Sequence, residues 1–147
     1  MLSYFNGNVY ESKCMNSFSK EGIFVEDRIT LQYDVLKELI SYSENLIPAL
    51  GEIIQELKGE GKEDTDDFLN EVINGINWEI EVYNQCAALI NERSNYIDKK
   101  AMIRAVKNLG ASLASGDRQI VAICLEEDFL PFINKLTLAA RAVVDVK

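Results

Sequence analysis

The stretch TDDFLNEVINGINWEIEVYNQCAALINERSNYI, from Thr65 to Ile97, decides the fold of this chain. Apolar and small side chains recur along it at steps of four and three residues, at Leu69, Ile73, Ile76, Ile80, Tyr83, Ala87, Ile90, Ser94 and Ile97. This spacing places one apolar stripe along a helix of about nine turns. A lone helix cannot bury such a stripe, so the pattern predicts a bundle in which other helices cover it.

A second stripe of the same period runs from Ile29 to Leu57. It passes through Ile29, Tyr33, Leu36, Ile40, Ser43, Ile47, Leu50, Ile54 and Leu57, and it is widened at seven-residue intervals by Leu39, Leu46 and Ile53. Pro48 lies within this stripe, whose phase continues across it, so we expect a kink and not a helix end. The polar linker 58–64 is short, and Gly59 suits a left-handed helix end, so the two long helices are expected to be antiparallel neighbours.

Two further helices are expected after this stretch. Asp98 can cap a short third helix that ends near Gly116, and Asp117 can cap a fourth. Pro131 lies inside the fourth helix, and the apolar register changes across it. We therefore predict a bend in the segment from Glu127 to Pro131.

Residues 1–25 differ from the rest and form a divergent N-terminal arm. Within it an Asn6-Gly7 pair stands between aromatic and β-branched residues, which is a hairpin signal, although a partly ordered arm is equally compatible with the sequence. The predicted fold class is all-α. We expect one domain, residues 1–147, built as an antiparallel bundle of four main helices, of which two are long, one is short and one is bent at Pro131.

Composition narrows the class of protein. An apolar content of 48% with 27% charged residues is typical of a globular chain, and the formal charge is −9. No basic stripe stands out, which argues against nucleic acid or an anionic membrane as partner. The sequence shows no run of about 20 apolar residues, and its N-terminus lacks the pattern of a signal peptide, so we expect a cytoplasmic protein. The three cysteines (Cys14, Cys86 and Cys124) are widely spaced, and Cys86 and Cys124 lie in apolar helical runs, where we expect free, buried thiols.

Residues that would carry chemistry are scarce. The chain has no histidine, which excludes histidine-based triads and histidine-ligated zinc, and it has no phosphate-binding glycine motif. The acidic run from Glu60 to Asp67 straddles a linker and a helix start, where acids are favoured by the helix dipole. We therefore predict a protein that is not an enzyme and that takes no metal and no cofactor.

Three acids beside the expected bend are candidates for an ion pair. Glu126, Glu127 and Asp128 lie where the apolar register shifts, so at least one should approach the buried face. A structural ion pair with Arg104 or Arg118 is the interpretation that this position favours.

Trp78, the only tryptophan, lies on the polar face of its helix. Either the N-terminal arm covers it or it belongs to a binding or dimer surface. Because the third helix is short, part of the seam between the long helices is expected to stay uncovered, and the candidate partner-binding residues are Trp78, Leu39, Leu46, Ile53, Tyr4 and Phe5. The uncovered seam predicts a non-enzymatic interaction module, such as an adaptor or small export-type chaperone, that binds a protein partner or forms a homodimer. The alternative is an acidic inhibitor or nucleic-acid mimic that occupies a basic site on another protein.

Two segments carry a resemblance. The stretch Leu113-Ala114-Ser115-Gly116-Asp117, through Leu125-Glu126-Glu127-Asp128-Phe129-Leu130-Pro131, resembles a turn and helix of small uncharacterised bacterial all-helical proteins, and the Asn74-Gly75-Ile76-Asn77-Trp78 segment is similar to a run in the same proteins. The chain departs from that pattern at Asp128. The resemblance implies a helical bundle, a domain of unknown function, and no established activity.

Overall fold

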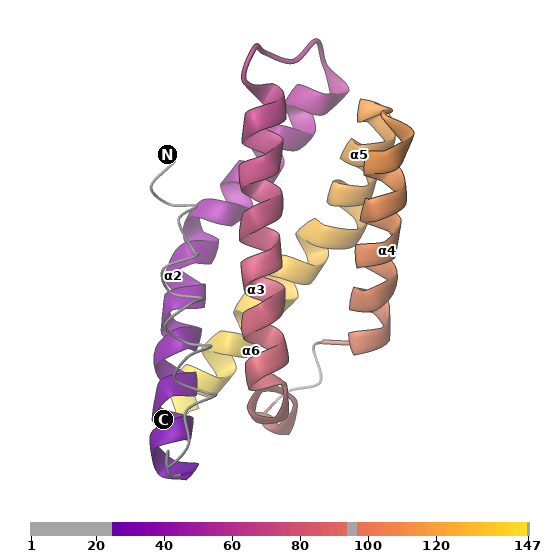
Figure 1. Ribbon diagram of the computed structural model, residues 1–147. Helices are drawn as coiled ribbons and strands as arrows, with labels where there is room; N and C mark the ends of the chain where they lie inside the picture. The colour runs from indigo at the N-terminus through magenta and orange to yellow at the C-terminus, as the bar shows by residue number, and fades with distance from the viewer. Residues whose placement is uncertain (1–24, 94–96, 147) are drawn as a thin grey trace.

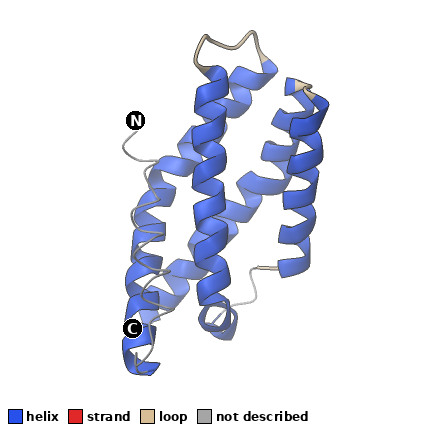
Figure 2. Cartoon of the chain, viewed as in Figure 1, coloured by secondary structure: helices blue, strands red, loops and turns tan. Residues whose placement is uncertain are grey.

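The computed structural model describes residues 25–93 and 97–146, and within them it contains helices and no strand (Figures 1 and 2). The predicted all-α class is therefore confirmed. The arm or hairpin is predicted for residues 1–25; residues 1–24 lie outside the described residues, and Val25 is the first residue of α2. In chain order the elements are α2 (Val25–Lys58), α3 (Thr65–Arg93), α4 (Lys99–Ser115), α5 (Arg118–Cys124), a π-helical turn η2 (Leu125–Phe129) and α6 (Leu130–Val146).

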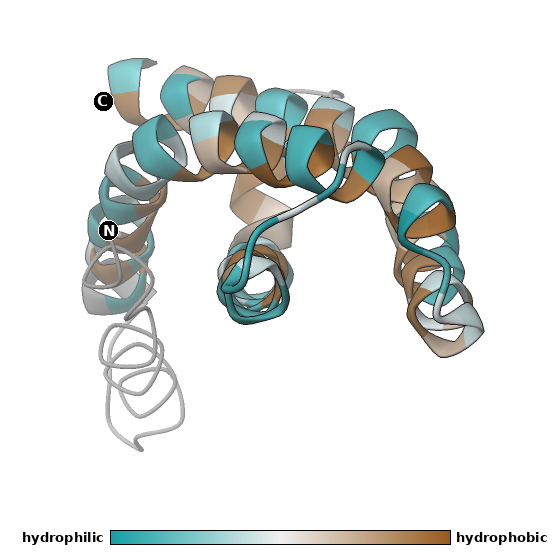
Figure 3. Cartoon of the chain, turned by 90° about the horizontal axis from the view of Figure 1, so that it is seen from above, coloured by the Kyte–Doolittle hydropathy of each residue, from teal (hydrophilic) through white to brown (hydrophobic). Residues whose placement is uncertain are grey.

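Helices α2, α3 and α6 pack on one another, and α4 joins the core through Met102, Ala105 and Leu109. Helix α2 packs on both α3 and α6, and α6 also packs on α3, whereas α4 packs mainly on α5 and η2. Seen from above, α3 lies on the concave side of an arch, with α2 at one end and α4 at the other (Figure 3). The bent final helix therefore covers the seam between α2 and α3, which we had expected a short third helix to leave partly open.

The buried face of α2 is largely the predicted one, whereas that of α3 is rotated from the predicted stripe. On α2 the predicted rows are buried at Leu36, Ser43, Leu50 and Leu57 and at Leu39, Leu46 and Ile53, whereas Ile40 and Ile47 are only partly buried. On α3 the predicted positions Leu69, Ile76, Tyr83 and Ile90 are buried, but Ile73 and Ile80 are only partly buried. The second buried row of α3 is instead Val72, Glu79 and Cys86, so an acid that the apolar pattern does not predict lies in the core.

The bend in the last helix is confirmed and has a definite cause. Residues Leu125–Phe129 form a π-helical turn between α5 and α6, and Pro131 follows at the second residue of α6. The buried side chains Val121, Leu125, Phe129 and Ile133 are each four residues apart. On an ideal α-helix each such step turns the stripe by about 40°, and a wider turn cancels that drift, which is why the apolar register changes here.

The helix ends follow the predicted caps with one exception. The side chain of Asp98 accepts a hydrogen bond from the backbone N–H of Lys100, Asp117 caps α5 in the same way, and Gly116 is left-handed with φ 72°. In the linker between α2 and α3, Gly61 and not Gly59 has a positive φ, of 78°. The positive φ requires glycine there, and the guanidinium of Arg118, which would lie 2.7 Å from an added β-carbon, packs close to it.

Helix α2 continues through Pro48, as predicted, and changes direction partway along its length (Figure 1). Cys86 and Cys124 are free and buried, which is also as predicted, while Cys14 lies outside the described residues. Among the described helices, none combines the length and the apolar character that crossing a bilayer requires.

Candidate functional site

A buried polar pair joins the two long helices. The hydroxyl of Ser43 on α2 donates a hydrogen bond of 2.8 Å to Oε2 of Glu79 on α3, and both residues are 0% exposed. The second carboxyl oxygen of Glu79 makes no hydrogen bond. Burial raises the pKa of Glu79 to about 8, against the opposing effect of the Ser43 hydrogen bond. The carboxyl is therefore protonated in the folded protein at pH 7.

Trp78 and Tyr42 make an aromatic contact next to this pair. Trp78 is only 3% exposed, and its ring meets that of Tyr42 edge to face, with ring centroids 5.1 Å apart and an interplanar angle of 65°. Burial, and then the nearby carboxyls of Glu79 and Glu71, raise the pKa of the Tyr42 hydroxyl. Trp78 thus lies against α2 and is not displayed on the surface.

Gly75 allows this contact because it has no side chain. A β-carbon at Gly75 would lie 2.5 Å from Oη of Tyr42 and 3.1 Å from its ring. Glycine in mid-helix is ordinarily less favourable than alanine by about 1 kcal/mol. Here the cost is offset by the close approach of α2 to α3.

Gly75→Ala is expected to lower the free energy of unfolding by about 1–3 kcal/mol, because Tyr42 must leave its place against Trp78. In a Tyr42→Phe background the nearest clash is removed, so the same substitution should cost at least about 1 kcal/mol less. Gly51 and Gly110 are matched controls, since a β-carbon there meets nothing within 4 Å and alanine should stabilise. Urea unfolding measures all of these, and equal effects of Gly75→Ala in both backgrounds would contradict the clash.

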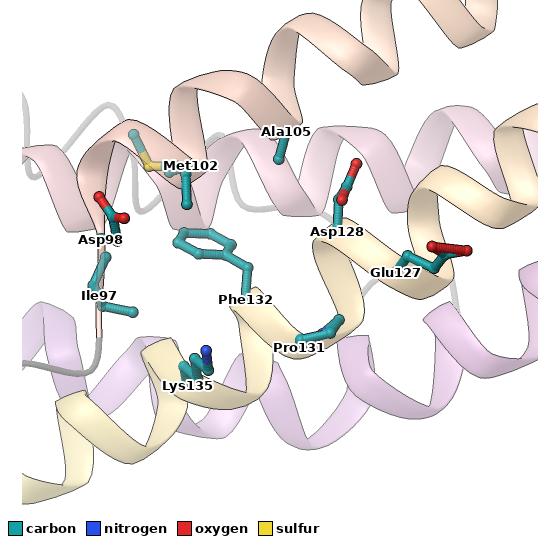
Figure 4. Close-up of a pocket in the computed structure, with 10 residues that line it drawn as sticks. Ile97, Asp98, Met102, Ala105, Glu127, Asp128, Pro131, Phe132 and Lys135 are labelled. Atoms are coloured by element: carbon teal, nitrogen blue, oxygen red, sulfur yellow. The ribbon is translucent and has the colours of Figure 1, made fainter.

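A cleft of about 220 Å³ opens beside the π-helical turn (Figure 4). It is lined by Ile97, Asp98, Ala101, Met102, Ala105, Glu127, Asp128, Pro131, Phe132 and Lys135. Figure 4 shows Phe132 of α6 pointing toward Met102 of α4. The apolar side chains come mainly from α4 and α6, and the charged groups at Glu127 and Lys135 are exposed to solvent. The cleft is therefore a solvated seam where α4 meets the bent helix.

The acids at the bend have partners other than those predicted. Glu126 forms an ion pair of 2.9 Å with Lys58, and Arg118 pairs with Asp66 at 3.0 Å. Asp128 accepts a hydrogen bond of 3.4 Å from the amide of Asn108. The predicted pairing of these acids with Arg104 or Arg118 is wrong. The acids stay near the surface, and the cation that pairs with Glu126 is Lys58 at the end of α2. The sequence does not show that this end of α2 lies beside the bend.

Helix α4 carries a basic and apolar face that the sequence analysis missed. Its cations are Lys99, Lys100, Arg104 and Lys107, all exposed, and it contains no acid. Three large apolar side chains on it are exposed as well, Ile103 at 42%, Val106 at 42% and Leu113 at 39%. The expectation that no basic stripe exists is therefore wrong for α4. The run KKAMIRAVK carried the signal, which the acidic net charge obscured.

The four predicted partner-binding residues that the structure describes are buried. Leu39, Leu46 and Ile53 are 0% exposed in the core, so the prediction that they line an uncovered groove is wrong for this structure. The bent helix from α5 to α6 covers them, since α5, η2 and α6 all pack on α2. Trp78 is buried too, and Tyr4 and Phe5 lie outside the described residues.

Metal ligation finds no support in the part of the chain that the structure describes. No three His, Cys, Asp or Glu side chains among these residues are grouped so that they would hold a metal ion. Acids of α2, of α3 and of the linker between them instead surround a hollow of about 550 Å³, whose lining is Glu52, Glu56, Lys62, Asp64, Asp67, Phe68, Asn70 and Glu71. Lys62 lies 3.8 Å from Glu56 and offsets part of that charge.

Comparison with known proteins gives a family and no activity. Neither a curated protein nor a solved structure matches the chain. A family model, described as a domain of unknown function (DUF8042), matches residues 34–139, which include α3, α4 and α5 in full and most of α2 and α6. The expected membership of an uncharacterised domain family is thus confirmed, and the chain belongs to the DUF8042 family.

Proposed function

We propose that this protein is a non-enzymatic interaction module, an adaptor or small chaperone, whose contact face lies on α4. The observation that carries the proposal is the exposed stripe of Ile103, Val106 and Leu113, which adjoins the row that α4 buries against α5 and η2. We call these three residues the α4 stripe. The proposal keeps the predicted class of function but moves the contact face from the α2–α3 seam to α4.

The distribution of exposed apolar side chains supports this face. Single exposed apolar residues are ordinary on soluble proteins, but a cluster marks an interaction site. Among the described residues, the large apolar side chains with high exposure are Ile29, Ile103, Val106, Leu113, Ile120, Ile123 and Leu138. Five of these seven lie on the short α4–α5 hairpin, whereas the core helices α2 and α6 contribute one each.

Site-specific photo-crosslinking tests the proposal. A photoreactive amino acid at Val106 of the full-length protein, in lysate of the source organism, is expected to give a discrete adduct with one protein. Ile29, exposed to a similar extent on α2, is the matched control position and should give none. The adduct should disappear when Ile103→Asp is added, because a buried charge would then enter the contact. The same diffuse adducts from both positions would contradict an interaction face on α4.

The alternative function, an acidic inhibitor that occupies a basic site, has one observation in its favour, the acidic hollow between α2 and α3. A crosslinker at Asp67 in the same experiment distinguishes the two. An adduct from Asp67 alone, lost at high salt, would favour the inhibitor, since exposed charge pairs are screened. An adduct from Val106 that persists in salt would favour the adaptor.

A further inference from the structure

We infer that the segment bound by the α4 stripe is an amphipathic helix with acidic residues along one edge of its apolar face. The inference rests on the proposed function and names the chemistry of the partner. It follows from the charges beside the stripe, from the absence of ion pairs between them and the described residues, and from the net charge of the rest of the chain.

Three of the four cations lie along one edge of the α4 stripe, and the fourth, Lys99, lies within the arc of the stripe at the start of the helix. At about 100° per residue, Ile103, Val106 and Leu113 span an arc of roughly 80° on α4. Lys100, Arg104 and Lys107 follow on the side away from α5, within the next 100° or so, while the other side is the buried row of Met102, Ala105, Leu109 and Ser112. A helix laid on the stripe would therefore have apolar side chains against it and one flank beside three cations.

These cations have no ion-pair partner among residues 25–93 and 97–146. None of the four cations of α4 forms an ion pair with a described residue; the cations that do so are Lys58, Lys62, Arg118 and Arg141. Two of the four, Lys99 and Lys100, stand in the first turn, where positive charge opposes the helix dipole. Helix stability therefore does not account for the charge pattern, whereas a partner with carboxylates does.

Charge and shape disfavour a second copy of the chain on this face. Pairing α4 with α4 would bring eight cations into one interface without an acid from either helix. The acidic hollow of another copy supplies carboxylates, but Phe68 is its one apolar lining residue, so it has nothing to pack along the α4 stripe. A foreign helix that carries both properties fits better.

Charge also disfavours an anionic membrane or nucleic acid. The whole chain has a formal charge of −9 and α4 contributes +4, so the rest of the protein carries −13. That charge would be repelled by an extended anionic surface, which approaches much of the protein at once. A single helix meets only α4, where the local charge is positive.

A displayed library of helices tests the inference on the full-length protein. Each member is an 18-residue amphipathic helix with a fixed leucine stripe, and the positions on either flank vary among Glu, Lys, Gln and Ala. Selection on the wild-type protein is expected to enrich Glu over Lys at one flank at least tenfold. The Arg104→Glu/Lys107→Glu variant should reverse that preference, because the cations that choose the partner are then acids.

Controls separate this inference from the proposed function. Ile103→Asp/Val106→Asp should abolish selection, and Ile29→Asp should leave it unchanged; all of these side chains are exposed, so circular dichroism should show an unaltered fold. No binder, or no preference for Glu, overturns the inference. The inference is also overturned if the protein co-floats with phosphatidylserine vesicles, if it binds RNA, or if it forms a dimer that Ile103→Asp disrupts. A discrete Val106 adduct to a segment without acids would overturn the acidic partner while the interaction module stands.

Discussion

Replacing Glu79 by methionine is expected to abolish a loss of stability that the wild-type protein shows as the pH rises from 5 to 8. Burial raises the pKa of Glu79 from 4.5 in the unfolded chain to about 8 in the folded protein. Between these values the folded state holds a proton that the unfolded chain releases, so the free energy of unfolding falls by about 1.4 kcal/mol per pH unit. The stabilising contribution is complete below pH 4.5 and is lost as the pH rises through about 8.

The measurement is urea unfolding of both proteins at each pH. Across pH 5 to 8 the stability difference between Glu79→Met and wild type should change by about 4 kcal/mol in favour of the variant. Ser43→Ala is the informative control. Its hydroxyl hydrogen bond holds the pKa of Glu79 down, so its removal should extend the wild-type loss to higher pH. Parallel pH profiles for wild type and Glu79→Met would show that the carboxyl does not titrate from a buried site.

A buried carboxyl that costs stability at neutral pH calls for a compensating role. Ser43 and Glu79 occupy core positions in rows that are otherwise mainly apolar, and each is the other's hydrogen-bond partner across α2 and α3. Sliding one helix by a turn would leave both groups buried without that partner. In coiled coils a polar residue in the seam fixes the register in this way. We therefore expect Glu79→Met to gain stability and to lose some uniqueness of helix pairing.

The sequence predicts the helices better than it predicts their faces. Spacing and capping residues predict the starts of α3, α4 and α5 and the end of α4 at Gly116, because caps and periodicity are local properties. Helix α3 ends at Arg93, before the predicted limit at Ile97. The bend before Pro131 is also local, since a shift of apolar register within one helix reveals it. These features require no knowledge of which elements become neighbours.

The parts that were wrong depend on contacts between distant elements. Glu79 is passed over because a stripe of apolar residues can be drawn through Ile80 instead, and only the position of Ser43 on another helix explains why the acid is buried. Likewise, α6 covers the seam between α2 and α3, and the sequence does not show this contact. The prediction of an open groove at Leu39 is wrong for that reason. The basic α4 face was readable locally, but averaging charge over the whole chain concealed it.

Trp78→Ala is expected to cost about 3–5 kcal/mol of unfolding free energy, which is the range for truncating a buried tryptophan. Trp78 is 3% exposed, and its contact with Tyr42 joins α3 to α2. If Trp78 instead belonged to a partner-binding surface, its truncation would change stability by no more than about 0.5 kcal/mol. Urea unfolding therefore distinguishes the two roles that its position on the polar face of α3 allows.

Trp78→Phe supplies the finer comparison. The indole N–H makes no hydrogen bond although it is buried, so phenylalanine removes an unpaired donor while it keeps a ring against Tyr42. We expect this variant to recover most of the loss caused by alanine. Because Trp78 is the only tryptophan, the fluorescence of the folded wild-type protein reports this site directly and should resist quenching by iodide. If iodide quenches the fluorescence readily and Trp78→Ala has a small effect on stability, Trp78 is exposed and is again a candidate contact for a partner.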